Sequence, residues 1–127
     1  MIINEITKAT PYLHSQIHNL LKQLTIKDVQ FTFDDFKSMV NLEQSILIGA
    51  FDGESLVGIL TIAIVQIPTS KHGRIEDVVV DKDYREKGIG KKLSLEAIRV
   101  AKELKLSKLF LTSNPKRVEA NKLYQKI

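Results

Sequence analysis

The chain has 127 residues, 43% of them hydrophobic and 27% charged, no cysteine and a formal net charge of +4. This length suits one domain over residues 1–127, and the lack of cysteine excludes disulfides, thiolate zinc ligands and cysteine nucleophiles. Without a signal-peptide pattern or an apolar run of roughly 20 residues, we expect a cytoplasmic protein with no membrane span, whose mild positive charge suits an anionic ligand.

The N-terminal part of the sequence predicts one strand and two helices. The strand covers Met1–Ile6. Thr10 and Pro11 have the pattern of an N-cap and a first helical residue, and apolar residues then recur at helical spacing over 11–24. A second helix is expected over 33–42, with two aspartates in its first turn, where negative charge favours the helix dipole.

The middle of the sequence predicts three strands in hairpin style. Ile46–Phe51 and Leu56–Ile67 are rich in β-branched and apolar residues, and Asp52-Gly53 between them is a hairpin signal. We expect Pro68–Gly73 to be a turn segment and Arg74–Val80 to be the third strand.

The C-terminal part predicts helix, strand and helix. The helix covers Ile89–Leu104, the strand covers Lys108–Thr112, and Asn114-Pro115 repeats the N-cap signature before a last helix that runs to the end. The order β-α-α-β-β-β-α-β-α predicts an α/β fold with a mixed sheet and helices on both faces. A right-handed crossover would make strands 74–80 and 108–112 parallel, with ligands at their carboxyl ends.

A glycine-containing loop, Arg85-Glu86-Lys87-Gly88-Ile89-Gly90, joins the third strand to the following helix. The first amides of a helix lack intrahelical partners, so this position can bind an anion, and glycine lets phosphate oxygens approach the backbone. A plain turn would have the same spacing. Lys92 and Leu93 break the P-loop and dinucleotide patterns, which disfavours nucleotide-dependent chemistry.

The stretch from Ile75 to Leu93, with this loop in its centre, resembles the acetyl-CoA motif of the GNAT superfamily of N-acetyltransferases. Downstream, Leu111-Thr112-Ser113-Asn114 and Ala120-Asn121-Lys122-Leu123-Tyr124 are similar to that family's next strand and following helix. The resemblance covers the whole chain in element order and implies a GNAT-like fold, acetyl-CoA as cosubstrate and no metal.

The resemblance also implies how acetyl-CoA is bound. The backbone of Val78 and Val80 would pair with the pantetheine arm as an added strand, in a sheet that splays after residue 80, and Asn114 would hydrogen-bond the same arm. A backbone N–H near Val79 or Val80 would stabilise the oxyanion. Amides of the loop would hold the pyrophosphate, namely those of Arg85, Glu86, Lys87, Gly88, Ile89, Gly90 and Lys91.

The implied reaction is direct attack of a primary amine on the acetyl group through a tetrahedral intermediate. Tyr124 would protonate the departing thiolate, although a tyrosine on an apolar stripe is also ordinary packing. Glu76 is the candidate base, directly or through a water; it alternates with Val78 and Val80 along the strand, and the alternative is a salt bridge with Arg74. Asp77 should then point to the opposite face.

His72, beside Gly73, is expected to be a turn residue rather than a second base. The acceptor should be a small-molecule or peptide amine, and by resemblance the helices at 11–24 and 33–42 form one wall of its site. The sequence does not indicate which amine. Nucleic acid is disfavoured, since aromatic stacking residues on a sheet face are lacking.

The resemblance weakens at the C-terminal end. Relatives continue after the tyrosine helix with Gly-Phe and two further strands, whereas this chain ends at Ile127. The strand at 108–112 would then have an exposed edge, which predicts a homodimer, strand exchange at that edge, or a chain cut short. The alternative function is an acetyl-CoA-binding sensor or partner-binding module without turnover.

Overall fold

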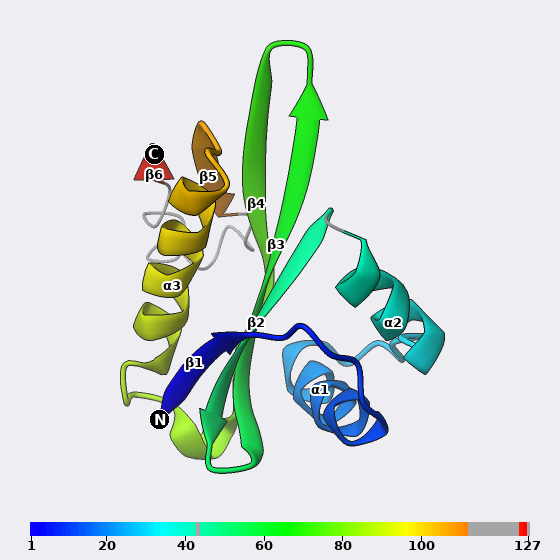
Figure 1. Cartoon of the computed structure of the whole chain (residues 1–127). Coiled ribbons are helices and arrows are strands. Elements are labelled where there is room, and N and C mark those ends of the chain that lie inside the picture. The colour runs from blue at the N-terminus through cyan, green and yellow to red at the C-terminus, as the bar shows by residue number, and fades with distance from the viewer. Residues whose placement is uncertain (43, 112–124, 127) are drawn as a thin grey trace.

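The strands follow the chain in order across one mixed sheet, β1-β2-β3-β4-β5-β6, in the computed structural model, which describes residues 1–42, 44–111 and 125–126 (Figure 1). Neighbouring strands are antiparallel except for the parallel pair β4 and β5. The predicted mixed α/β sheet is therefore confirmed. The bounds are β1 Ile2–Glu5, β2 Ser45–Asp52, β3 Ser55–Ile67, β4 Ser70–Val80, β5 Lys108–Leu111 and β6 Gln125–Lys126.

The first backbone amides of a helix have no partners within the helix, and a side chain at the helix start can accept hydrogen bonds from them. Thr10 caps α1 (Pro11–Leu24) by accepting a hydrogen bond from the Leu13 amide at 3.2 Å, as its sequence signature predicts. Thr32 and Asp35 form a reciprocal capping box at the start of α2 (Phe33–Asn41). In contrast, α3 (Ile89–Glu103) begins at Gly88 without a side-chain cap.

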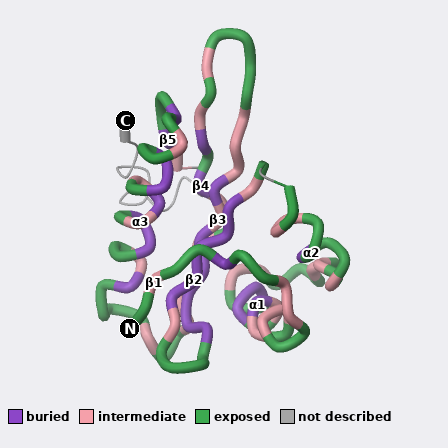
Figure 2. The backbone as a smooth tube through the Cα atoms, viewed as in Figure 1, coloured by how far each residue is buried: buried purple, intermediate pink, exposed green. Residues whose placement is uncertain are grey.

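Two apolar layers hold the helices against opposite faces of the sheet, with α3 on one face and α1 and α2 on the other (Figure 1). A continuous run of buried backbone follows the central strands (Figure 2). The α3 layer includes Ile48, Leu60, Ile62, Leu93, Ala97 and Leu109. The α1–α2 layer includes Ile17, Leu20, Phe36, Leu47, Ile59 and Val79. Strands β2 to β4 therefore bury side chains on both faces of the sheet.

The hairpin of β3 and β4 is longer than the sequence predicts. Pairing continues to Ile67↔Ser70, so the expected turn over Pro68–Gly73 is wrong and the turn contains only residues 68–69. The reason lies at Gly73, where a Cβ would come within 3.0–3.1 Å of three buried side chains, those of Ile62, Leu106 and Leu109. This glycine serves close packing inside the strand rather than a turn.

The C-terminal end also differs from the prediction. Gln125–Lys126 form β6, which pairs with β5 through Lys108↔Lys126 and Leu109↔Gln125, so the expected helix is wrong at these two residues. The outer edge of β5 was expected to be exposed. At these positions β6 of the same chain pairs with it, so these backbone groups of β5 find partners without a second protein chain. Asn114 and Tyr124 lie outside the described residues.

Candidate functional site

A β-bulge interrupts β4 next to the centre of the sheet. Ile59 of β3 pairs with Val79, but Thr61 pairs with Glu76, so β4 carries one extra residue between these positions. Asp77 lies in the bulge with a φ of 52°, in the left-handed region that aspartate tolerates better than most side chains. The bulge therefore changes which side chains share a face of the strand.

The side-chain directions on β4 correct the predicted alternation. Val78 and Val80 pack toward the α3 layer, whereas Glu76 pairs with Thr61, whose side chain faces α1 and α2. Glu76 thus does not share a face with the two valines, because the extra residue shifts the period-two pattern. The same shift places Asp77 opposite Val78 and Val80, as predicted, but on the same side of the sheet as Glu76: it lines a cavity on the α1–α2 side together with Thr61.

The pairing of the parallel strands β4 and β5 is described as far as Leu111. It contains Gly73↔Leu109, Arg74↔Phe110 and Ile75↔Leu111, and residues 112–124 lie outside the described part of the chain. The expected opening of the sheet after residue 80 therefore stays a prediction. Residues 76–80 of β4 lead directly into the segment that contains the glycine loop.

The loop after β4 is fixed to the rest of the fold by contacts that are distant in sequence. The Tyr84 hydroxyl donates a hydrogen bond to the Asp52 carboxylate at 2.7 Å, in the turn between β2 and β3. The Lys82 amide donates to the Gln23 side chain of α1 at 2.9 Å. The hydrogen bond to Asp52 raises the pKa of Tyr84, because it favours the protonated phenol. Sequence reasoning did not find Tyr84, since its partner lies 32 positions away.

The start of α3 presents free backbone donors to open space. Gly88 has a φ of 77°, and the first intrahelical hydrogen bond runs from the Lys92 amide to the Gly88 carbonyl at 3.0 Å. The amides of Ile89, Gly90 and Lys91 precede it and have no carbonyl partner in the helix. A Cβ built on Gly90 would meet no surrounding protein atom within 4 Å, so the space beside this residue is open. The unpaired amides and the helix dipole favour a phosphate group at this end of α3 electrostatically.

The two cations of the loop lie beside it with partners of their own. The Arg85 guanidinium donates from Nε to the Val80 carbonyl at 3.2 Å, and the Lys87 ammonium lies 5.2 Å from the centre of the Tyr84 ring. Both residues are exposed. The arrangement supplies positive charge next to the helix start, which strengthens binding of an anion by the backbone amides.

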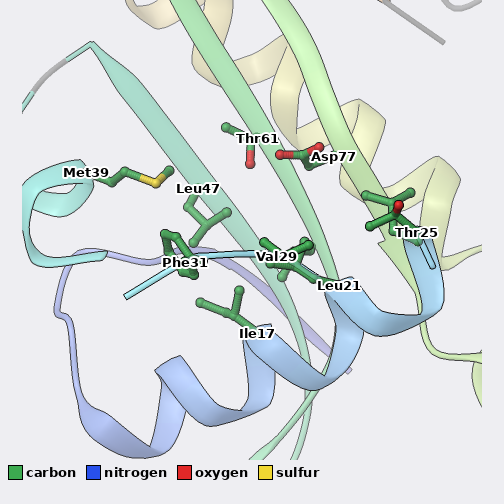
Figure 3. A pocket seen from close by; sticks show the side chains of 11 residues that line it. Ile17, Leu21, Thr25, Val29, Phe31, Met39, Leu47, Thr61 and Asp77 are labelled. Carbon is green, nitrogen blue, oxygen red and sulfur yellow. The ribbon is translucent and has the colours of Figure 1, made fainter. Parts of the chain in front are cut away.

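A cavity of about 170 Å³ lies on the other side of the bulge, between α1, the segment after it, α2 and strands β2 to β4 (Figure 3). Its lining is mostly apolar, and Asp77 supplies a carboxylate beside Thr61. Partial burial and the negative charge of Glu76 raise the pKa of Asp77. Glu76 itself lies 3.6 Å from Arg74, the ion pair that the sequence offered as its alternative role. The helices expected to form a wall of the acceptor site do line this cavity.

His72 lies within β4, where its Nδ1 is 2.9 Å from the Ser70 hydroxyl, and not in a turn. Among the described residues there is no group of three or more histidine, aspartate and glutamate side chains that could hold a metal ion. In the same part of the chain, no helix is long and apolar enough to cross a membrane.

Comparison with known proteins relates this geometry to one family. The sequence profile of the acetyltransferase (GNAT) family matches residues 14–127. The crystal structure of aminoglycoside acetyltransferase meta-AAC0020, from an uncultured soil metagenomic sample, in complex with trehalose has a TM-score of 0.83, with 18% identity over 94% of this chain and 81% of that chain.

Two further solved structures share the fold. Glucosamine-6-phosphate N-acetyltransferase from Arabidopsis thaliana has a TM-score of 0.78, with 21% identity over 97% of this chain and 90% of that chain. An aminoglycoside 6'-N-acetyltransferase complexed with coenzyme A has a TM-score of 0.74, with 22% identity over 87% of this chain and 61% of that chain. Identities of this size establish a common fold.

Proposed function

We propose, from the finding that this chain belongs to the acetyltransferase (GNAT) family, that it transfers an acetyl group from acetyl-CoA to a primary amine. The family makes it an acyl-CoA-dependent N-acetyltransferase by class, and coenzyme A is present in one of the solved structures that share its fold. One observation carries the proposal. A single strand, β4, contains the bulge beside the cavity and leads to the uncapped start of α3.

The glycine loop would hold the pyrophosphate of acetyl-CoA. Its donors would be the unpaired amides at the start of α3, and the open space beside Gly90 would let the anion approach the backbone. The pantetheine arm would lie along residues 76–80, paired with the backbone of Val78 and Val80, and Asn114 would hydrogen-bond the same arm. A backbone N–H near Val79 or Val80 would stabilise the oxyanion formed when the amine attacks.

Proton transfer completes the proposed reaction. The attacking amine must lose a proton, and we assign this step to Glu76, directly or through a water, because it lies beside the bulge on the same side as the cavity. The leaving thiolate would take a proton from Tyr124. The amine would attack the acetyl carbon directly, through a tetrahedral intermediate, and no acyl-enzyme would form.

The test is product analysis. Acetyl-CoA incubated with the protein and a panel of primary amines should yield acetylated amine and free coenzyme A in equal amounts, as measured by mass spectrometry and thiol titration. Binding of acetyl-CoA, seen as a thermal shift, without any acetylated product would instead support the acetyl-CoA-binding sensor.

A further inference from the structure

We infer that the acceptor is a primary amine carried on a compact apolar group, with the apolar group in the cavity beside the bulge and the ammonium group on Asp77. This inference rests on the proposed function and names its substrate class. It comes from the lining, size and position of the cavity in this chain.

The lining of the cavity favours a hydrocarbon body. Most of its residues are apolar, and they come from two helices, the segment between those helices and two strands, including Ile17, Leu21, Phe31, Met39, Leu47 and Ile59. A hydroxylated acceptor such as a sugar would place hydroxyl groups against these side chains without partners, which costs binding energy. An apolar group instead gains from leaving water.

The charges at the cavity select an amine. Asp77 is the one carboxylate among the residues that line it, and no lysine or arginine of the described chain is among them (Figure 3). The nearby Glu76 adds a second negative charge, partly balanced by Arg74 at 3.6 Å. A cationic head group is therefore attracted to the Asp77 end, while the opposite end accepts only apolar atoms.

The size of the cavity limits the apolar group. Its volume is about 170 Å³, and an apolar cavity of about 150 Å³ is known to bind benzene. A phenyl ring or a branched alkyl chain of similar size fits, whereas an aminoglycoside does not fit inside.

The position of the cavity connects it to the proposed reaction. Asp77 directly precedes Val78, whose backbone is proposed to pair with the pantetheine arm. An amine held by Asp77 would therefore lie beside the arm that carries the acetyl group. Glu76, the proposed base, is the adjacent residue, so binding of the amine and removal of its proton are assigned to neighbouring carboxylates.

The inference is tested by comparing kcat/KM for 2-phenylethylamine, 3-methylbutylamine, ethanolamine and an aminoglycoside, with acetyl-CoA saturating. We expect both apolar amines to exceed ethanolamine and the aminoglycoside by at least about tenfold. A peptide with an N-terminal leucine tests whether the acceptor is a peptide or a small molecule. A higher kcat/KM for this peptide than for 3-methylbutylamine would identify the acceptor as a peptide N-terminus. A lower kcat/KM would identify it as a small-molecule amine. Equal or better turnover of the polar amines would overturn the inference and leave the proposed function intact. No turnover of any amine would overturn both.

Two variants of the cavity sharpen the test. Asp77→Asn should raise KM for 2-phenylethylamine by about tenfold with KM for acetyl-CoA unchanged, since asparagine also tolerates a positive φ. Asp34→Asn, on the exposed side of α2, is the matched control and should change neither value.

Val29→Trp should fill the cavity from a half-buried position after α1 and reduce kcat/KM more for 2-phenylethylamine than for ethanolamine. A thermal shift with acetyl-CoA confirms that each variant is folded. Equal losses for both amines in Val29→Trp, or an unchanged amine KM in Asp77→Asn, would contradict the assignment.

Discussion

The hydroxyl of Tyr84 donates a 2.7 Å hydrogen bond to the carboxylate of Asp52. Tyr84 belongs to the loop that leads to α3, and Asp52 ends β2 at the hairpin turn. This contact ties the proposed pyrophosphate loop to the central hairpin, so the loop is held in place before any ligand binds. Preorganisation of this kind lowers the entropy that binding must overcome.

Replacing Tyr84 by phenylalanine should therefore weaken acetyl-CoA binding. The hydrogen bond is solvent-exposed, so we expect only a small effect, about a two- to fivefold rise in the Kd for acetyl-CoA. Calorimetric titration measures this value. Tyr12→Phe, at an exposed position on α1, is the control and should bind like the parent chain. Equal affinities in Tyr84→Phe and the parent chain would show that the contact does not organise the loop.

The two glycines of the loop should respond differently to alanine. Gly88→Ala should destabilise the fold by about 1 kcal/mol, because a φ of 77° is unfavourable for residues with a Cβ. Gly90→Ala should keep or raise stability, since Gly90 lies inside α3 and alanine favours helix. The Cβ of Gly90→Ala would nonetheless enter the proposed phosphate position, and acetyl-CoA affinity should fall by at least about tenfold.

Urea unfolding and calorimetric titration of both glycine variants separate the two effects. If Gly90→Ala binds acetyl-CoA with the same affinity as the parent chain, the pyrophosphate does not bind at the start of α3.

Glu76→Gln should lower kcat by about 100-fold if this carboxylate takes the proton from the amine. The same substitution breaks the ion pair with Arg74, so Arg74→Met is the matched control, which breaks that pair and keeps the carboxylate. Arg74→Met should retain most of kcat, and both variants should differ little in stability because the pair is exposed. Similar kcat values for the two variants would assign Glu76 to the ion pair alone.

The raised pKa of Asp77 predicts how stability depends on pH. A carboxyl group whose pKa is higher in the folded state than in the unfolded state binds more protons when folded, so its contribution to stability is lost as pH rises through the folded pKa. The Asp77→Asn variant has no titrating carboxyl group at this position, so its stability does not fall in this way as pH rises. The Tm of Asp77→Asn relative to the parent should therefore increase from about pH 4 to about pH 7.

Asp35 provides the opposite case. Hydrogen bonds with Thr32 lower the pKa of Asp35, so its contribution is present above the unfolded pKa and lost as pH falls. The Tm of Asp35→Asn relative to the parent should therefore decrease as pH rises from about 2.5 to about 4.5 and change little above that range. Thermal unfolding of the parent chain, Asp77→Asn and Asp35→Asn over these pH ranges measures how each relative Tm changes with pH. Changes of the same sign for the two variants would contradict the environments assigned to Asp77 and Asp35.

Local patterns predicted much of the fold correctly. Thr10 and Pro11 gave the start of α1, and the glycine loop was placed correctly between β4 and α3. Those signals depend on residues adjacent in sequence. The sequence around Gly73 predicts a turn, because a glycine required by packing against Leu106 and Leu109 cannot be distinguished in sequence from a turn glycine.

The features that differ from the predictions depend on pairing between distant segments. A period-two alternation assumes a regular strand, and the extra residue at Asp77 becomes visible only in the register between β3 and β4. That single shift separates Glu76 from the face of Val78 and places Asp77 in the cavity. The partner of Tyr84 is likewise determined by the tertiary fold.

The most direct test of the account is the initial rate of coenzyme A release from acetyl-CoA, measured by thiol titration with and without a primary amine. We predict that release depends on the amine, saturates with its concentration and falls in Gly90→Ala. Release at the same rate without amine, or no release from a protein whose thermal stability rises with acetyl-CoA, would contradict acetyl transfer to an amine.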